Sequence, residues 1–474
     1  MFKRTDFIKH APKITRWIDQ YFHTIEDFPV KSRAIPKQVY DEIPDTAPEE
    51  GESLEVILED LDKTIMPGIT HWQHPNFHAY FNANSSVESV FAETITAAIG
   101  AQCMIWDTSP AAAELEERMM EWLQKAMVLP ADFEGVIQDS ASSATLTALL
   151  TAREVKTNFS SNETGVPNNL RVYCSTETHS SVEKAVGICG IGRKNLIKIP
   201  VNESMSLITE ELEKQIQLDI DNGLVPCCAV ATLGTTGTMA IDPLAAIGVI
   251  CKKYGLWLHV DAAQAGSALL LPEYRWISKG MENADSFVFN PHKWLFTNFD
   301  CSAYFVKDTS MLIRTFDILP EYLKTDKRGT VKDFRDWGIP LGRRFRALKL
   351  WFVLRGYGLK TIRGILRHHI SLNDFFAKEI NKRADFEMVQ EPFLNFSCFR
   401  YKPSGVDNKD HLNALNKELL KNINDSGKAF ISHTTVRGDT VLRMVIGQTY
   451  VEEKHVKKTL EAIFSSALKL DPSK

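Results

Sequence analysis

The 474-residue chain lacks the features that mark membrane-spanning and secreted proteins. No apolar stretch approaches the ~20 residues needed to cross a bilayer, and no apolar signal core follows the basic start at Lys3 and Arg4. Its eight cysteines form no Cys-x-x-Cys pair, and a chain of this size needs no disulfides to stabilise its core. We therefore expect reduced, buried thiols and a cytoplasmic protein.

An excess of one charge is also missing, because 55 Lys and Arg stand against 60 Asp and Glu, a formal net charge of -5. This balance gives no electrostatic reason to expect nucleic acid or a membrane surface as a partner. Global disorder is excluded by the 26 Phe and 9 Trp, because disordered chains contain few such residues. No internal repeat, Gly-x-Ser-x-Gly elbow or phosphate-binding loop ending in Gly-Lys-Ser/Thr is present.

The length predicts two or three domains, at roughly 150 residues per domain. Apolar residues at helical spacing from Ile14 to Ile25 predict an N-terminal helix, whose apolar face packs on its own domain or on a partner subunit. We divide the chain into an N-terminal segment (1–85), a large domain (86–370) and a small α+β domain (371–474). In the last of these, Arg437-Gly438-Asp439 separates two strand-like runs and predicts a hairpin.

Short apolar runs alternate with helical segments in the large domain. The predicted helices include Ala144–Val155, Thr209–Asp221 and Pro243–Tyr254. The predicted strands are 135–138, 171–175, 196–199, 227–233, 256–261, 286–290 and 302–306. Nearly all-apolar strands that alternate with helices predict an α/β fold with a mostly parallel central sheet covered by helices on both faces. Ligands of such sheets bind at the carboxyl ends of the strands.

Polar residues occur at three of these strand ends. Asp261 shares a strand face with His259, and a carboxylate there is costly unless it meets a cation, although a plain turn or helix-cap role is an alternative. Lys293 follows another apolar strand beside His292, where desolvation favours an uncharged, nucleophilic amine, although most lysines are structural. The turn 138–143 precedes a predicted helix and offers N–H groups to a phosphate, unless Ser142 is an ordinary N-cap.

Two further patterns are weaker. Gly190-Ile191-Gly192 follows a helix instead of a strand and lacks the third glycine of a dinucleotide site, which argues against a nicotinamide dehydrogenase. His71, His74 and His78 have a spacing that can ligate a metal. No Cys or carboxylate completes a plausible set nearby, so we expect no metal site.

Together the three strand ends favour one cofactor, pyridoxal phosphate. A carboxylate for a pyridinium nitrogen, a lysine for an aldehyde and a helix N-terminus for a phosphate are what this cofactor requires of a protein. The carboxylate keeps the ring nitrogen protonated, so that the ring withdraws electrons. The lysine holds the aldehyde until a substrate amine displaces it.

The chain resembles the group II pyridoxal-phosphate amino-acid decarboxylases, and most closely the aromatic-L-amino-acid decarboxylases. The likeness runs almost end to end, from His74–Phe81 to the C-terminal helix. Its most specific motifs are Asn290–Trp294, His259–Ala263 and Ile339–Arg344. The resemblance implies a fold-type I homodimer in which the N-terminal segment clasps the other subunit.

The resemblance also implies roles for individual residues. Lys293 matches the lysine that binds the cofactor covalently, Asp261 the partner of the pyridinium nitrogen, and His179 the residue stacked on the ring. Tyr322 matches the tyrosine on the family's mobile loop. The positions close to the phosphate or the ring are Ala141, Ser142, Asn290, His292, Thr236 and Ala263.

Other residues concern the substrate. Trp72, Tyr80 and Phe81 resemble the aromatic pocket wall of the family. Gly342 stands where relatives that prefer phenolic substrates can carry Ser and those that accept indoles carry Gly. Departures from the family pattern, which leave the cofactor chemistry intact and bear on the choice of substrate, occur at Asn82, Gln102, Met104 and Gln264.

We therefore expect decarboxylation of aromatic L-amino acids to arylalkylamines and carbon dioxide. The expected substrates are tryptophan or 5-hydroxytryptophan, with L-DOPA, tyrosine or phenylalanine also used and negligible turnover of glutamate. One alternative is a decarboxylase-oxidase that forms aldehydes, although such relatives tend to replace the residue at His179 by Asn or the one at Tyr322 by Phe. A non-catalytic binding protein is disfavoured because Lys293, Asp261 and His179 are all present.

Overall fold

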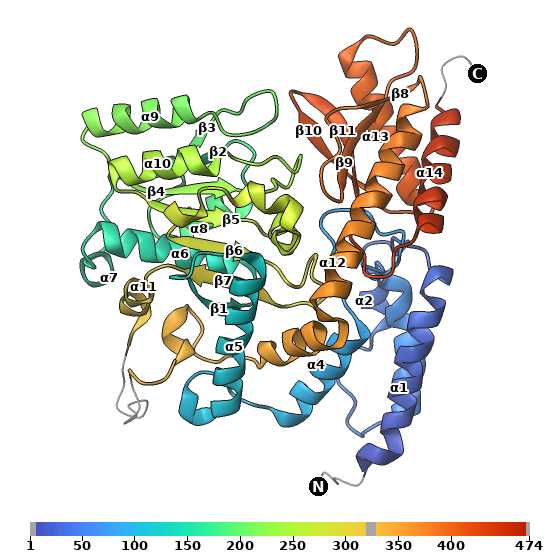
Figure 1. Cartoon of the computed structure of the whole chain (residues 1–474). Helices are drawn as coiled ribbons and strands as arrows, with labels where there is room; N and C mark the ends of the chain where they lie inside the picture. The colour runs from blue at the N-terminus through green and yellow to red at the C-terminus, as the bar shows by residue number, and fades with distance from the viewer. Residues whose placement is uncertain (1–5, 319–328, 471–474) are drawn as a thin grey trace. The chain divides into compact units, whose positions relative to one another are not determined.

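The computed structural model describes residues 6–318 and 329–470, and these divide into two compact units. One unit combines the chain up to Asn82 with the chain from Leu372 onwards, and the other comprises Ala83–Ser371 (Figure 1). The predicted division into three parts stays a prediction. Within the described ranges, no helix is long and apolar enough to cross a membrane.

The larger unit is built on a seven-stranded sheet of order β1-β7-β6-β5-β4-β2-β3. Its strands are β1 (Glu134–Gln138), β2 (Leu170–Ser175), β3 (Leu196–Ile199), β4 (Val225–Thr232), β5 (Trp257–Asp261), β6 (Ser286–Phe289) and β7 (Ser302–Val306). In this sheet β7 runs antiparallel to β1 and β6, and the other neighbours pair in parallel. The predicted α/β fold with a mostly parallel sheet is therefore confirmed.

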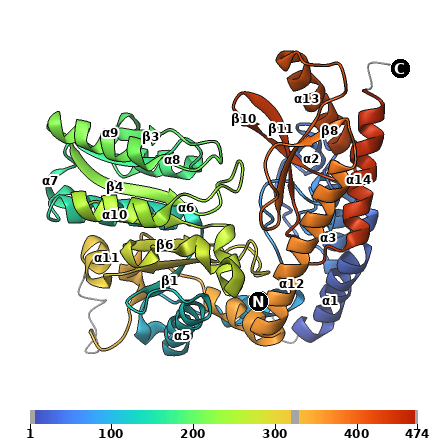
Figure 2. The same cartoon turned by 45° about the horizontal axis from the view of Figure 1, so that its top comes forward.

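Helices cover both faces of this sheet (Figure 2). The helices that begin in this unit include α4 (Val87–Ile99), α5 (Pro110–Met127), α6 (Ala141–Lys156), α7 (Ser161–Thr164), α8 (Ser180–Ile188), α9 (Thr209–Asp221), α10 (Leu244–Tyr254), α11 (Thr309–Phe316) and α12 (Arg346–Asn381), which is interrupted at Gly358. Tyr173 points to one face, where its hydroxyl donates to Asp219 of α9 at 2.7 Å. The next residue, Cys174, points to the opposite face and joins a core with α6 and α8.

The smaller unit contains a four-stranded antiparallel sheet of order β10-β11-β9-β8. Its strands are β8 (Phe386–Met388), β9 (Phe396–Tyr401), β10 (Ser432–Val436) and β11 (Asp439–Val445). Its helices are α1 (Asp6–Thr24), α2 (Gln38–Glu42), α3 (Leu54–Asp60), α13 (Lys409–Asp425) and α14 (Glu453–Leu468). The predicted hairpin is confirmed, because Val436 pairs with Asp439 across a turn in which Arg437 and Gly438 both have positive φ.

Hydrogen bonds tie the N-terminal segment to this smaller sheet. The N–H of His78 donates to the carbonyl oxygen of Phe430 at 2.8 Å, and the N–H of Val445 donates to that of His78 at 3.1 Å. Nδ2 of Asn76 donates to the carbonyl oxygen of His455 in α14 at 2.6 Å. These bonds explain why the segment and the C-terminal residues form one unit.

Gly266 provides a test of the packing around the end of β5. A Cβ at this position would lie 2.4 Å from Cβ of Phe289 and 3.4 Å from Cβ of Ala262. We expect Gly266→Ala to lower the free energy of unfolding by ~1–3 kcal/mol, because a packed core accommodates an added methyl only with strain. Gly51 is the matched control, since its added Cβ would meet no atom within 4 Å. Equal unfolding midpoints of the two variants in urea would contradict this packing.

Candidate active site

The candidate site lies at the edge of the larger sheet where the parallel strands end. Asp261 is the last residue of β5, Lys293 follows β6, and His179 follows β2 just before α8. The carboxyl ends of parallel strands share one edge of a sheet. The structure thus places these three sequence-predicted residues at the same edge.

Asp261 is buried, with 4% of its surface exposed. Its Oδ1 accepts a hydrogen bond from the N–H of Ala263 at 3.0 Å, which orients the carboxylate. One such bond does not offset the cost of burying an ionised carboxylate. The position therefore suits a carboxylate that faces a cation.

His259, two residues earlier on the same strand face, is neutral. Its Nδ1 pairs with Oγ of Ser286 at 2.9 Å, and its Nε2 pairs with Oγ1 of Thr145 in α6 at 3.3 Å. Burial lowers the pKa of His259 to about 4. His259 therefore joins β5, β6 and α6 at neutral pH without supplying a positive charge.

Main-chain hydrogen bonds hold the loop that carries Lys293. The N–H of Asn290 donates to the carbonyl oxygen of Ala263 at 3.1 Å, and the N–H of Lys293 donates to that of Asn290 at 2.9 Å. The carbonyl oxygen of Lys293 accepts a bond from Nδ2 of Asn84 at 2.6 Å. The loop is thereby fixed to the residues that follow Asp261.

His292, next to Lys293, has a defined protonation state. Its Nδ1 accepts a hydrogen bond from the N–H of Cys301 at 2.9 Å. Burial, followed by the charge of Lys293, lowers the pKa of His292 to about 3. A neutral ring whose Nδ1 accepts carries its proton on Nε2, so His292 is a neutral hydrogen-bond donor.

His179 reaches the surface at the N-terminus of α8, where its Nδ1 accepts a hydrogen bond from the N–H of Ser181 at 3.2 Å. Desolvation of the ring lowers the pKa of His179, with Asp261 acting to raise it and Lys293 to lower it. Both charges therefore act on His179, and the structure brings together the three residues that carry the predicted chemistry.

Helix α6 begins earlier than predicted. Its N-cap is Ser140, whose Oγ accepts a hydrogen bond from the N–H of Ser143 at 3.2 Å, so the alternative that made Ser142 the N-cap is wrong. Ala141 and Ser142 instead occupy the first two helical positions. Within the described ranges their N–H groups make no hydrogen bond. Such groups at the positive end of a helix dipole suit a phosphate.

The remaining positions predicted for the cofactor lie around the same edge. Oδ1 of Asn290 accepts a hydrogen bond from Oγ of Ser302 at the start of β7, which leaves Nδ2 as the donor of this amide. Thr236 lies in the turn after β4 and is partly exposed, and Ala263 follows β5. A buried carboxylate, a lysine, a helix terminus and neutral donors fit the requirements of pyridoxal phosphate.

The substrate-side residues predicted in the larger unit lie together. Oε1 of Gln102 accepts a hydrogen bond from the N–H of Arg343 at 2.7 Å, and the carbonyl oxygen of Met104 accepts one from the N–H of Arg335 at 2.8 Å. A Cβ on Gly342 would lie 3.4 Å from Nε2 of Gln102. The amide of Gln102 therefore lies beside Gly342 at van der Waals distance from where a Cβ would be.

Arg343 fixes the segment that carries Gln102, although the sequence analysis gave Arg343 no individual role. Its buried guanidinium donates to Oε1 of Glu116 at 2.5 Å, to the carbonyl oxygen of Ile137 at 2.9 Å and to that of Cys103 at 3.3 Å. It thus joins α5, β1 and the segment that carries Gln102. The sequence feature that could have pointed to Arg343 is its position directly after the apolar run Ile339–Gly342.

The other substrate-side predictions belong to the smaller unit. The rings of Trp72 and Tyr80 are stacked, with centroids 5.7 Å apart. Asn82 is buried, and its Nδ2 donates to a main-chain carbonyl oxygen at 2.8 Å. The guanidinium of Arg443 lies 5.5 Å from the ring centroid of Phe81 and is a buried cation that the sequence analysis missed.

The sequence analysis also named Tyr322, three histidines and Gln264. Tyr322 lies outside the described residues. Nδ1 of His71, His74 and His78 pairs respectively with a tyrosine hydroxyl, a main-chain N–H and a main-chain carbonyl oxygen. No group of three potential metal ligands occurs within 6–318 and 329–470. Gln264 is buried beside the site, with 2% of its surface exposed.

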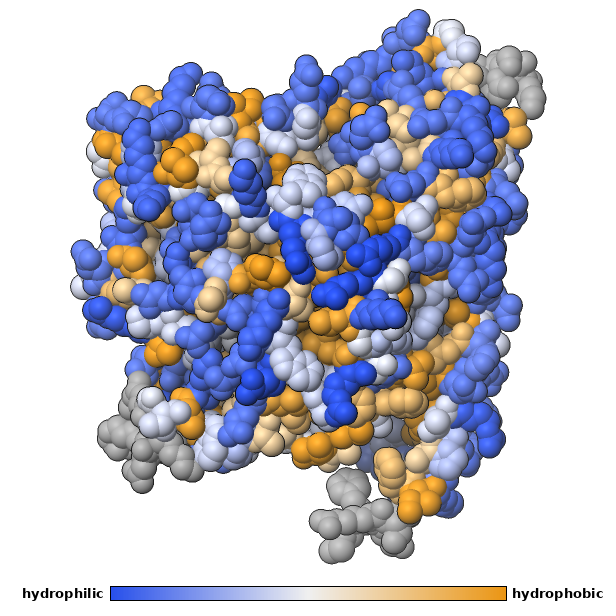
Figure 3. All heavy atoms as spheres, in the orientation of Figure 1, coloured by the Kyte–Doolittle hydropathy of each residue, from blue (hydrophilic) through white to orange (hydrophobic). Residues whose placement is uncertain are grey.

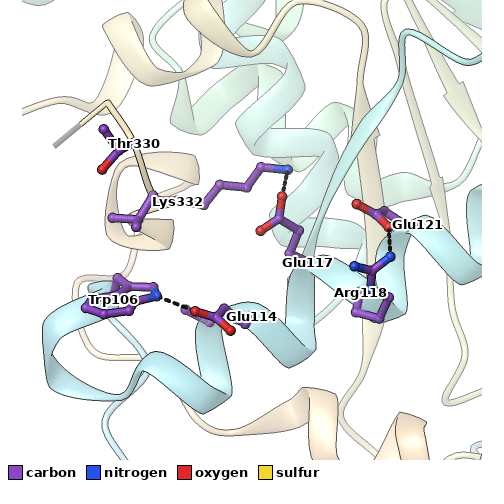
Figure 4. A pocket seen from close by; sticks show the side chains of 9 residues that line it. Trp106, Glu114, Glu117, Arg118, Glu121, Thr330 and Lys332 are labelled. Carbon is purple, nitrogen blue, oxygen red and sulfur yellow. Dashed lines mark hydrogen bonds and ion pairs between the residues drawn. The ribbon is translucent and has the colours of Figure 1, made fainter. Parts of the chain in front are cut away.

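A cavity of about 330 Å³ beside α5 contains none of the predicted residues (Figure 4). Its charged lining is internally paired, with Lys332 2.9 Å from Glu117 and Arg118 2.7 Å from Glu121. Nε1 of Trp106 donates to Glu114 at 2.9 Å. We therefore give this cavity no part in the chemistry.

Comparisons with known proteins extend over the whole chain. Residues 36–402 match the family described as pyridoxal-dependent decarboxylase conserved domain. Phenylacetaldehyde synthase of Arabidopsis thaliana is 43% identical over 461 residues, 95% of this chain and 94% of that protein. Tyrosine decarboxylase 2 of Narcissus pseudonarcissus is 42% identical over 460 residues, 95% and 91% of the two chains. The crystal structure of Oryza sativa TDC with PLP and tryptamine matches with a TM-score of 0.96 at 33% identity, over 99% of each chain.

The sheet edge and these matches define a class, the α/β enzymes that depend on pyridoxal phosphate. Within that class the chain belongs to the pyridoxal-dependent decarboxylase family. It is a carboxy-lyase, its cofactor is pyridoxal phosphate, and its substrate is an amino acid. The predictions of family, fold class, enzyme class and cofactor are thus confirmed, and the roles of individual residues stay predictions.

Replacement of Asp261 tests whether its carboxylate balances a cation. We expect Asp261→Asn to lower kcat/KM by at least ~100-fold, as removal of a preorganised charge from a water-poor site does. Carbon dioxide release at saturating pyridoxal phosphate measures this effect. Asp221→Asn, exposed at the end of α9, is the control and should behave as wild type. Near-normal activity of Asp261→Asn would make the carboxylate a plain turn residue.

Proposed function

We propose that the protein releases carbon dioxide from aromatic L-amino acids and forms the corresponding arylalkylamines. The observation that carries the proposal is His179, whose ring is held by Ser181 and feels the charges of both Asp261 and Lys293. In the family that the chain resembles, a histidine here and a tyrosine at Tyr322 accompany amine formation. Tyrosine decarboxylase 2, at 42% identity, supports the aromatic class of substrate.

In this proposal Lys293 binds the cofactor covalently and Asp261 pairs with the pyridinium nitrogen. His179 would hold the ring, together with Thr236 and Ala263. The residues that would bind the phosphate are Ala141, Ser142, Asn290 and His292. When bound, pyridoxal phosphate accepts the electron pair that carbon dioxide leaves behind.

The side chains around the cofactor would orient the reacting groups and would donate or hold protons. The carboxylate of Asp261, already oriented by the N–H of Ala263, keeps the pyridinium nitrogen charged. The neutral Nε2–H of His292 binds phosphate without adding a positive charge near the ring. Tyr322, assisted by His179, would supply a proton to the α-carbon, and the amine of Lys293 would allow the product to leave.

The residues that we propose for the substrate side are Trp72, Tyr80, Phe81 and Asn82 in the smaller unit and Gln102, Met104 and Gly342 in the larger unit. Gly342 gives room for an indole, and the amide of Gln102 beside it offers a polar neighbour to a hydroxylated ring. Because a few lost apolar contacts cost only ~1–3 kcal/mol, the pocket excludes smaller rings weakly. We therefore propose tryptophan or 5-hydroxytryptophan as substrates, with L-DOPA, tyrosine or phenylalanine also used.

Glutamate is the critical comparison, because Arg443 places a guanidinium beside Phe81. That guanidinium is buried, lies 5.1 Å from the ring centroid of Phe396 and donates to Oγ of Ser432 at 2.6 Å. A cation already packed between two rings and bonded to a hydroxyl is poorly placed to bind the side-chain carboxylate of glutamate. We therefore propose negligible turnover of glutamate.

Initial rates with tryptophan, 5-hydroxytryptophan, L-DOPA, tyrosine, phenylalanine and glutamate test the proposal, with amine, aldehyde and carbon dioxide all quantified. We expect amine in a one-to-one ratio with carbon dioxide from the aromatic substrates. Aldehyde as the main product would favour the second candidate, a decarboxylase-oxidase. The 43% identity to phenylacetaldehyde synthase supports this candidate. A preference for glutamate would refute the aromatic assignment.

We also propose that the protein is a homodimer. On α4, Phe91, Ile95 and Ile99 form a stripe at intervals of four residues and expose 53%, 42% and 58% of their surfaces. In the smaller unit, Phe7 and Ile8 of α1 are exposed by 67% and 83%. Hydrophobic residues gather at the N-terminal end of this helix in Figure 3. Exposed apolar patches of this kind mark protein–protein interfaces.

Light scattering of the purified protein tests the dimer. We expect twice the 53.5 kDa chain mass for wild type and a shift toward monomer for Ile95→Asp, because the substitution places a charge in the middle of the stripe. Val249→Asp is the matched control, since Val249 is 64% exposed on α10. A monomeric wild type, or equal masses for both variants, would contradict the proposed interface.

A further inference from the structure

We propose that Ser181 is a positioning residue that fixes His179 as the tautomer with its proton on Nε2. This inference deepens the proposed function, because it rests on His179 acting at the cofactor ring. The three charged or polar residues Asp261, Lys293 and His179 belong to the predicted site, whereas the sequence analysis gave Ser181 no role.

Two contacts converge on Nδ1 of His179. The N–H of Ser181 donates to it at 3.2 Å, and Oγ of Ser181 lies 2.8 Å away. A main-chain N–H is only ever a donor, so Nδ1 must present its lone pair. The hydroxyl of Ser181 is then also a donor, and the neutral ring carries its single proton on Nε2.

The same contacts disfavour the doubly protonated ring. A proton on Nδ1 would face the N–H of Ser181 and break the cap at the start of α8, while Lys293 adds repulsion from the loop after β6. Asp261 of β5 acts in the opposite direction. Because Ser181 is only 8% exposed, water has little access to replace its hydroxyl.

The consequence is a neutral donor that faces away from α8. Nε2–H of His179 can donate a hydrogen bond on the side away from α8, whereas Nδ1 accepts its hydrogen bonds from Ser181 at the start of that helix. A ring held this way neither rotates to exchange its two nitrogens nor gains a second proton near neutral pH. Its role in the proposed reaction therefore depends on Ser181, which acts through His179.

Hydrogen exchange at the C2 position of His179, followed against pH by mass spectrometry, reports the titration of this ring without any turnover. We expect a wild-type midpoint below the ordinary value of ~6.5. Loss of one neutral hydrogen bond should raise the midpoint in Ser181→Ala by about half to one pH unit. Ser181→Thr keeps the hydroxyl and should restore the wild-type midpoint, and Ser180→Ala, an exposed neighbour, should leave it unchanged.

The pH profile of kcat/KM gives a second readout. Its acidic limb should move upward in Ser181→Ala by the same amount as the exchange midpoint, with the plateau of kcat largely kept. A wild-type midpoint at or above ~6.5 would overturn the proposal even if the variants fail to fold, and so would identical midpoints in Ser181→Ala and Ser180→Ala. Absence of activity on aromatic amino acids would refute the proposed function alone, because the exchange experiment uses no substrate.

Discussion

A carboxylate buried at the end of a central strand is the constraint on which the candidate site depends. Asp261 has 4% of its surface exposed and one main-chain hydrogen bond, while its neighbour on the strand face, His259, is neutral. An ionised carboxylate in such a place requires a positive partner. A bound pyridinium nitrogen meets that requirement, so the cofactor explains why a carboxylate is buried at the end of this strand.

Neutral histidines keep the charges of the site few. Burial lowers the pKa of His259 to about 4 and that of His292 to about 3, and the pKa of His179 is lowered as well. Nδ1 of His179 and of His292 accepts a main-chain N–H, and Nδ1 of His259 pairs with the hydroxyl of Ser286. The site thus combines the carboxylate of Asp261 and the amine of Lys293 with histidines that carry no charge near neutral pH.

Much of this arrangement was predictable from the sequence, because the signals are local. The sequence shows where the apolar strands before Asp261 and Lys293 end. Because these strands pair in parallel, their carboxyl ends lie at one edge of the sheet. The N-cap of α6 was misassigned because three serines, Ser140, Ser142 and Ser143, compete within four positions, and only tertiary structure decides where the helix begins.

Arg343, which the sequence analysis missed, acts over long sequence separations. Its N–H meets Gln102 across 241 positions, and its guanidinium reaches Glu116 across 227. Arginines are normally solvent-exposed, so the burial of Arg343 beside a glutamate is not visible in composition or periodicity.

The covalent attachment of the cofactor tests the central claim most directly. Borohydride reduction of the protein loaded with pyridoxal phosphate, followed by peptide mapping, identifies the lysine that holds the aldehyde. The account predicts a single pyridoxyl group on Lys293 in wild type and its loss in Lys293→Ala. A label on another lysine, or none on Lys293, would contradict it.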